Sequence, residues 1–138
     1  MNHEIQKVKD FVIAGNALFT IENTQTGNRF TFKVKKPKHG ENKERIRFVS
    51  LLNGPDNYSN YCYLGCIYNM GQFKLTKGSK VKPSAQSVKV FSWFWKHVEN
   101  LPANVKVYHE GRCGRCGRRL TVPVSIQSGF GPECINHL

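Results

Sequence analysis

Hydrophobic and polar residues alternate along several stretches of the chain, which is the pattern of half-buried β-strands. The first two stretches, residues 17–22 and 29–34, flank a turn at residues 25–28 and predict a β-hairpin. Further strands are expected over residues 45–52, 58–69 and 72–76, which gives an antiparallel sheet of about five strands. A last short strand over residues 105–108 leads into a cysteine-rich tail.

Two stretches have the three-to-four-residue spacing of a helix instead. The first, residues 4–14, fits either a short helix or an irregular lead-in. The second covers residues 85–99, with Ser84 as its expected N-cap and a buried stripe made of Val88, Phe91, Trp95 and Val98. The predicted fold class is therefore α+β. A basic antiparallel sheet packed by one main amphipathic helix occupies residues 1–104, and a metal-binding appendage occupies residues 105–138.

The charge of the chain narrows the class of partner. Its 138 residues include 21 Lys and Arg but nine Asp and Glu, a formal charge of +12. This excess excludes an acidic mimic of DNA and favours an anionic partner: nucleic acid first, then a free nucleotide, then an anionic membrane surface. No stretch approaches the roughly 20 apolar residues of a membrane span, and the first residues lack the pattern of a signal peptide. We therefore expect a soluble, cytoplasmic protein.

The spacing of the last three cysteines predicts a metal site. Cys113 and Cys116 form a Cys-x2-Cys knuckle followed by a glycine, and Cys134 supplies a third thiolate. A closed structural zinc site needs four ligands, so one more donor is required. His137 would place two ligands on one turn of a terminal helix, as in a treble clef, whereas His109 would arrive from the preceding strand. Spacing alone favours His137.

The tail also resembles a small zinc-finger family of unassigned function that is common in bacteriophage genomes. The residues that carry the resemblance are His109, Gly111, Arg112, Cys113, Cys116, Gly117, Arg118, Leu120, Thr121, Pro123, Ser125, Ile126, Gly129, Gly131, Pro132 and Cys134. Residues 14–20, 54–57 and 63–65 are similar to the leading domain of the same phage proteins. The relatives often stop within a residue or two of the last cysteine, which implies that His109 is the fourth ligand. A phage origin implies the cytoplasm of the bacterial host.

Two groups of residues are candidates for binding nucleic acid. The first group consists of four arginines around the knuckle, whose planar guanidinium groups are suited to binding phosphate oxygens: Arg112, Arg115, Arg118 and Arg119. On the sheet, alternation places charges and aromatic rings together at Lys33, Lys35, Arg45, Arg47, Tyr61 and Tyr63. Bases stack on such rings while cations follow the phosphates. In the alternative interpretation the tyrosines cap the core, the lysines solvate the sheet, and the arginines only balance the thiolates.

These features predict a phage-type accessory protein that binds single-stranded or structured nucleic acid and holds one structural zinc ion. The alternative is a small phage inhibitor or modulator of a host or defence complex, acting by protein–protein contact. An enzyme is not expected, because the acidic residues are scattered and no Walker-type loop is present. Cys62 and Cys66, about 13 Å apart on an extended strand, are expected to be buried free thiols.

Overall fold

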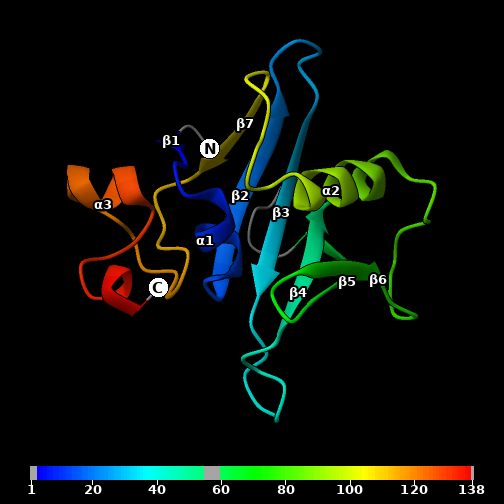
Figure 1. Ribbon diagram of the computed structural model, residues 1–138, viewed down its shortest axis with the longest axis horizontal. Coiled ribbons are helices and arrows are strands. Elements are labelled where there is room, and N and C mark those ends of the chain that lie inside the picture. Colours follow the sequence, from blue (N-terminus) through cyan, green and yellow to red (C-terminus); the bar gives the residue numbers. More distant parts are fainter. Residues whose placement is uncertain (1–2, 55–59, 138) are drawn as a thin grey trace.

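The computed structural model describes residues 3–54 and 60–137, and within them seven strands form an antiparallel sheet (Figure 1). The strands are β1 (His3–Glu4), β2 (Asn16–Asn23), β3 (Arg29–Lys35), β4 (Ile46–Leu52), β5 (Tyr61–Tyr68), β6 (Gln72–Leu75) and β7 (Val105–His109). The helices are α1 (Val8–Ile13), α2 (Gln86–Lys96), α3 (Pro123–Ser128) and the short 3-10 helix η1 (Cys134–His137). The α+β class is confirmed, with more strands than predicted.

The predicted hairpin is confirmed as β2 and β3. Phe19 pairs with Phe32 in its register, so both rings lie on the same face of the sheet. The turn is held by the Asn23 side chain, whose Oδ1 accepts hydrogen bonds from the backbone N–H groups of Gln25 and Thr26. Turn-forming residues between two alternating stretches are the local pattern from which a hairpin can be predicted.

The sheet order is β1-β7-β2-β3-β4-β5-β6, so β7 lies between β1 and β2. Phe19 pairs with His109 across β2 and β7, and His3 pairs with His109 across β1 and β7. The sheet therefore extends across the boundary predicted between residues 104 and 105. The two-residue strand β1 is too short to produce an alternating pattern, which is why the sequence did not predict it. The predicted start of β5 at residue 58 lies outside the described residues.

Helix α2 covers one face of the sheet through aromatic contacts. The ring of Phe91 lies 4.9 Å from that of Phe32, and the ring of Phe94 lies 6.0 Å from that of Phe19. The predicted stripe is confirmed, because all four of its members are buried. The predicted N-cap is wrong: Ala85 occupies that position with no side-chain hydrogen bond, and the helix ends at Lys96 rather than at residue 99.

The short helix α1 connects the sheet to the tail. Its Phe11 is fully buried, with its ring 5.6 Å from that of His109 and 5.8 Å from that of Phe130. The tail, drawn in orange and red in Figure 1, therefore packs beside α1 and the β1 edge of the sheet. None of the helices in the described part of the chain is long and apolar enough to cross a bilayer.

Candidate metal centre and basic surface

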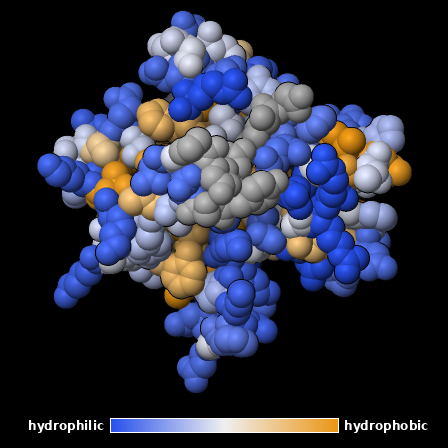
Figure 2. All heavy atoms as spheres, turned by 180° about the vertical axis from the view of Figure 1, so that it is seen from behind, coloured by the Kyte–Doolittle hydropathy of each residue, from blue (hydrophilic) through white to orange (hydrophobic). Residues whose placement is uncertain are grey.

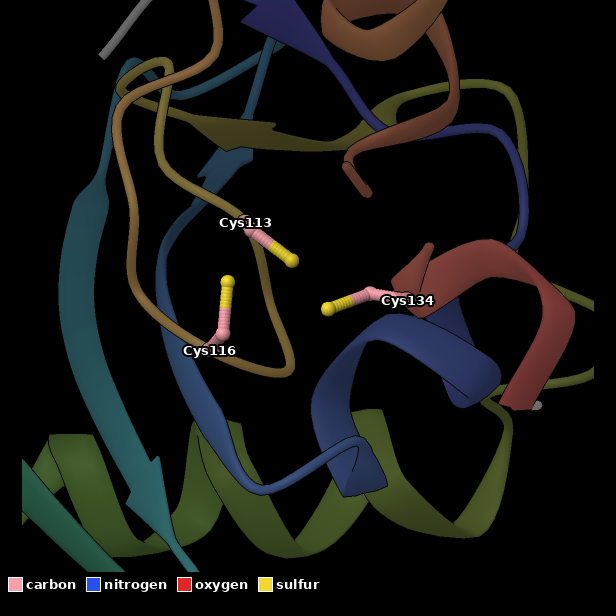
Figure 3. Close-up of side chains that lie close together, drawn as sticks. All are labelled: Cys113, Cys116 and Cys134. Atoms are coloured by element: carbon pink, nitrogen blue, oxygen red, sulfur yellow. The ribbon is translucent and has the colours of Figure 1, made fainter. Parts of the chain in front are cut away.

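Three cysteine sulfurs converge in the tail (Figure 3). Cys113 and Cys116 lie in the turn that follows β7, and Cys134 is the first residue of η1. The three Sγ atoms all lie within 4.8 Å of one another. Residues that are 21 positions apart at the extremes thus present their thiols to one point, which is the arrangement a metal ion requires.

Close packing fixes the knuckle between the first two cysteines. Gly117 has a φ of +78° and donates its N–H to the Cys113 carbonyl at 2.9 Å, which closes the turn. A Cβ atom at Gly114 would lie 2.7 Å from the Phe11 ring, and one at Gly117 would collide with the Asn16 amide. Glycine is favoured at Gly114 because the buried Phe11 ring fills the space beside it, and at Gly117 because of its positive φ.

Backbone N–H groups point at the sulfurs. The Cys113 Sγ accepts hydrogen bonds from the N–H groups of Arg115 and Gly131, each at 3.4 Å, and the Arg115 guanidinium lies 3.7 Å from the Cys134 Sγ. Burial opposes ionisation of Cys113, but the donated N–H groups outweigh it and hold the pKa of this thiol below its ordinary value. Burial and the neighbouring sulfurs raise the pKa of Cys116. Cys113 is therefore already biased towards the thiolate form that binds a metal.

The donor set fits a soft divalent ion. Thiolates select zinc and similar metals over magnesium or calcium, whose preferred ligands are oxygens. Among the described His, Cys, Asp and Glu side chains, these three sulfurs form the group able to hold a metal. The structure thus supports a metal site at Cys113, Cys116 and Cys134.

The structure does not bring His109 to the sulfurs. Its imidazole is fully buried: Nε2 donates to the Ile126 carbonyl at 2.7 Å, and Nδ1 accepts the Gly111 N–H at 3.0 Å. Both ring nitrogens are therefore already used, and the ring acts as a polar core residue stacked on Phe11. Burial is the main reason that the pKa of His109 is lowered, which favours the neutral ring that these two bonds need.

His137 also lies outside the group of three sulfurs. It is an exposed residue at the end of η1 and lines a hollow of about 350 Å³ together with Asp10, Arg47 and Arg115. The three cysteines instead line a separate cleft of about 370 Å³, whose lining also includes Arg118, Arg119, Ser125 and Glu133. Neither predicted histidine completes the ligand set in this arrangement.

The four tail arginines have different environments. Arg112 is half-buried, donates to the Gly117 carbonyl at 3.2 Å and lies 3.9 Å from a Glu110 carboxylate oxygen, so it helps to hold the knuckle. Arg115, Arg118 and Arg119 are exposed. Arg118 and Arg119 line the cleft beside the cysteines, whereas Arg115 lies on the side that faces the sheet. The predicted group is therefore divided between two surfaces.

The sheet face that α2 does not cover brings lysines and aromatic rings together. The Lys33 ammonium lies 4.4 Å from the centre of the Tyr61 ring, a cation–π contact. On the neighbouring strand, the rings of Phe48 and Tyr63 are 6.1 Å apart, and Phe48 is 40% exposed. Lys35 pairs with Phe48 in the register of β3 and β4. Figure 2 shows this side of the molecule as mostly hydrophilic, with small separate hydrophobic patches.

Tyr63 is held in place by its hydroxyl group, which accepts a hydrogen bond from Thr76 at 2.8 Å and lies 3.1 Å from the Cys66 sulfur. Burial and the Cys66 contact raise the pKa of Tyr63 to about 12. Burial, followed by the charge of Lys35, lowers the pKa of Lys33. Both side chains are therefore positioned by the sheet rather than free in solvent.

Cys62 and Cys66 are free thiols, as predicted, with Cys66 buried and Cys62 half-buried.

One predicted surface residue is in fact part of the interior. Arg47 is 6% exposed and donates to the carbonyls of Ile13, Lys43 and Ile46 at 2.7 to 3.0 Å. It pairs with Ile67 on the helix-covered face, so the expected grouping of Arg47 with Lys33 and Lys35 is wrong. Arg45 is exposed but precedes β4. Phe48, which shares the face of Lys35, was missed because a lone exposed phenylalanine in a strand pattern has no distinguishing signal.

Comparison with known proteins adds a family match for the tail. Residues 103–138 match a family of unknown function (DUF6011). The matched segment contains β7, the three cysteines, α3 and η1. No curated protein and no solved structure matches the chain.

Proposed function

We propose that this protein binds nucleic acid, single-stranded or structured, and that one zinc ion held by Cys113, Cys116 and Cys134 stabilises its tail. The observation that carries the proposal is the sheet face on which Lys33, Lys35, Phe48, Tyr61 and Tyr63 gather. An exposed ring beside fixed cations is suited to a base stacked above a phosphate chain. The charge of +12 supplies the attraction that such binding needs.

The proposed zinc ion has a structural part in this function. Bound to the three thiolates and one further donor, it would supply a cross-link between the knuckle and η1, coupling about 10–16 kcal/mol of binding to folding of the tail. The residues of the chain do the remaining work: Gly114 and Gly117 allow the knuckle to lie against α1, and N–H groups favour the thiolate at Cys113. The resemblance to bacteriophage proteins supports an accessory role in an infected cell.

The proposal can be tested by fluorescence anisotropy with a labelled single-stranded oligonucleotide. We expect affinity to fall linearly with salt on a log–log scale. Replacing Phe48 by Ala should weaken binding about 5- to 150-fold, the equivalent of about 1–3 kcal/mol for one stacked base. Trp93→Ala is the matched control, because Trp93 is also 40% exposed but lies on α2, on the other side of the sheet.

Two outcomes would reject the proposal: affinity that does not change with salt, or equal affinities of the Phe48 and Trp93 variants. A capture experiment with nuclease-treated host lysate separates it from the alternative of a protein modulator. Loss of the captured material after nuclease supports nucleic-acid binding. A protein partner retained after nuclease, with no affinity for the oligonucleotide, would favour the modulator.

A further inference from the structure

A cleft with a strongly cationic lining lies where the sheet meets the tail. It has a volume of about 310 Å³, and its charged lining residues are Lys35, Lys36, Lys38, Lys43 and Arg115. None of the described residues that line it carries a carboxylate. Four of these cations come from the end of β3 and the loop that follows it, while Arg115 comes from the knuckle about 70 residues further on.

Backbone contacts hold the three converging segments together. The Lys36 N–H donates to the Gly15 carbonyl at 3.0 Å, and the Asn16 N–H donates to the Gly114 carbonyl at 2.8 Å. A Cβ atom on Gly15 would lie 3.6 Å from the Lys36 Cβ and 3.7 Å from the Arg115 carbonyl oxygen. The start of β2 is therefore in contact with the loop on one side and the knuckle on the other, which fixes the shape of the cleft.

The charges in this cleft are only partly compensated. Lys36 forms an ion pair with Glu44 at 2.6 Å. Gathering five like charges raises the free energy of the folded chain, and a bound anion with several oxygens lowers it again. A phosphate group suits the combination of lysine point charges and an arginine fork better than a single carboxylate does.

The cleft adjoins the aromatic face of the sheet. Lys35 lines the cleft and also pairs with Phe48 in the register of β3 and β4. A strand whose base stacks on Phe48 would thus present its neighbouring phosphates to the cleft. The Arg115 guanidinium reaches the cysteine cluster as well, since it lies 3.7 Å from the Cys134 Sγ.

We infer that this junction cleft, centred on Lys35, Lys38, Lys43 and Arg115, is the site that binds the phosphate backbone of the nucleic acid. The inference rests on the proposed function and adds where the backbone lies. It also makes the position of one phosphate-binding residue, Arg115, depend on the folded cysteine knuckle.

The test compares two double variants that remove the same charge. Lys38→Gln/Lys43→Gln alters exposed lysines of the cleft, and Lys89→Gln/Lys96→Gln alters exposed lysines of α2. If the cleft binds two phosphates through the first pair, the slope of log affinity against log salt for a labelled single-stranded oligonucleotide should fall by about 1.4. The α2 pair should leave the slope unchanged. Circular dichroism and metal analysis check that both variants remain folded and loaded.

The results distinguish failure of the cleft as the phosphate-binding site from failure of the proposed nucleic-acid binding itself. Equal slopes for the two double variants, with clear binding by the parent protein, would reject the cleft and leave the proposed function standing. No binding by the parent protein would reject the proposed function, and the inference with it. A second measurement is an NMR titration of the protein with inorganic tripolyphosphate. Changes in the backbone amide chemical shifts of Gly15, Lys36 and Arg115 would support the cleft as the binding site, and changes confined to other residues would reject it.

Discussion

The ring of His109 shows how one residue type can serve two different purposes in the same position of a motif. A histidine four residues before a Cys-x2-Cys pair is well placed to bind zinc, and the resemblance of the tail implied that role. In the structure its nitrogens satisfy the Gly111 N–H and the Ile126 carbonyl instead. Leaving either group unpaired in the interior would cost about 1–3 kcal/mol. The imidazole is therefore a structural bridge between the end of β7 and α3.

Metal analysis of single variants tests this assignment. We expect His109→Gln and His137→Gln to retain one zinc ion per chain, because neither ring lies with the three sulfurs. Cys113→Ser should lose the ion, because it removes the thiol whose ionisation the N–H groups favour. Loss of zinc from either glutamine variant, with its fold retained, would identify that histidine as a ligand.

The buried imidazole also predicts a pH dependence of stability. The pKa of His109 in the folded protein lies below its ordinary value of 6.5, so below about pH 6.5 the unfolded chain binds more protons than the folded one. The free energy of unfolding contributed by this residue is thus constant at higher pH and declines as the pH falls through 6.5 towards the lowered pKa.

Denaturant unfolding of the parent protein and of His109→Gln at a series of pH values measures this effect. The stability advantage of the parent protein should shrink as the pH is lowered from about 7.5 to about 5, whereas acid release of the metal affects both proteins alike. A stability difference that stays constant over this range would show that His109 does not titrate as a buried neutral ring.

At the scale of elements, periodicity predicted the elements that have one covered face. The β2–β3 hairpin and the stripe of α2 could be read from the sequence, because each buries one side against a continuous core. The buried position of Arg47 could not be predicted, because charged and apolar residues alternate around it as they do around Lys33. Only the pairing of β4 with its neighbouring strands shows which face of the sheet Arg47 occupies. Likewise, the spacing of the three cysteines predicted their cluster, but spacing does not report whether a nearby histidine is already hydrogen-bonded.

The N-terminus of α2 offers a prediction at this scale. Ala85 has the extended backbone of an N-cap (φ −63°, ψ 144°) but no side chain to bond the exposed N–H groups of the first turn. Ala85→Ser should therefore raise the free energy of unfolding by about 1 kcal/mol. Ser84→Ala, at the position that the sequence favoured, should change it by less than about 0.5 kcal/mol. Thermal unfolding of the two variants measures both effects. A clear loss of stability in Ser84→Ala, with no gain in Ala85→Ser, would contradict the assignment of Ala85 as the N-cap.

At the scale of the whole molecule, one buried core runs from the sheet into the tail, and Phe11 of α1 lies between the two parts. The sheet and α2 are held mainly by contacts among aromatic rings such as Phe19, Phe32 and Phe91. The tail packs instead through Phe130 and His109 on Phe11. The sheet core should therefore tolerate loss of the metal better than the tail does.

Hydrogen exchange with and without a chelator measures this difference. Removing the metal should abolish protection over residues 111–137 while β3, β4 and β5 keep most of theirs. The aromatic contacts of the sheet with α2 do not involve the sulfurs, so we expect the sheet to lose less protection than the tail. Uniform loss of protection across the chain would show instead that the two regions unfold as one unit.

The place of β7 between β1 and β2 has a consequence for how the chain folds during translation. Until residues 105–109 have left the ribosome, one side of β2 has no neighbour, and its N–H and C=O groups remain available to any other strand. A nascent chain that stalls within the long segment between β3 and β7 would expose this edge to self-association. Release of β7, directly ahead of the cysteine-rich segment, is thus the step that covers this edge of β2.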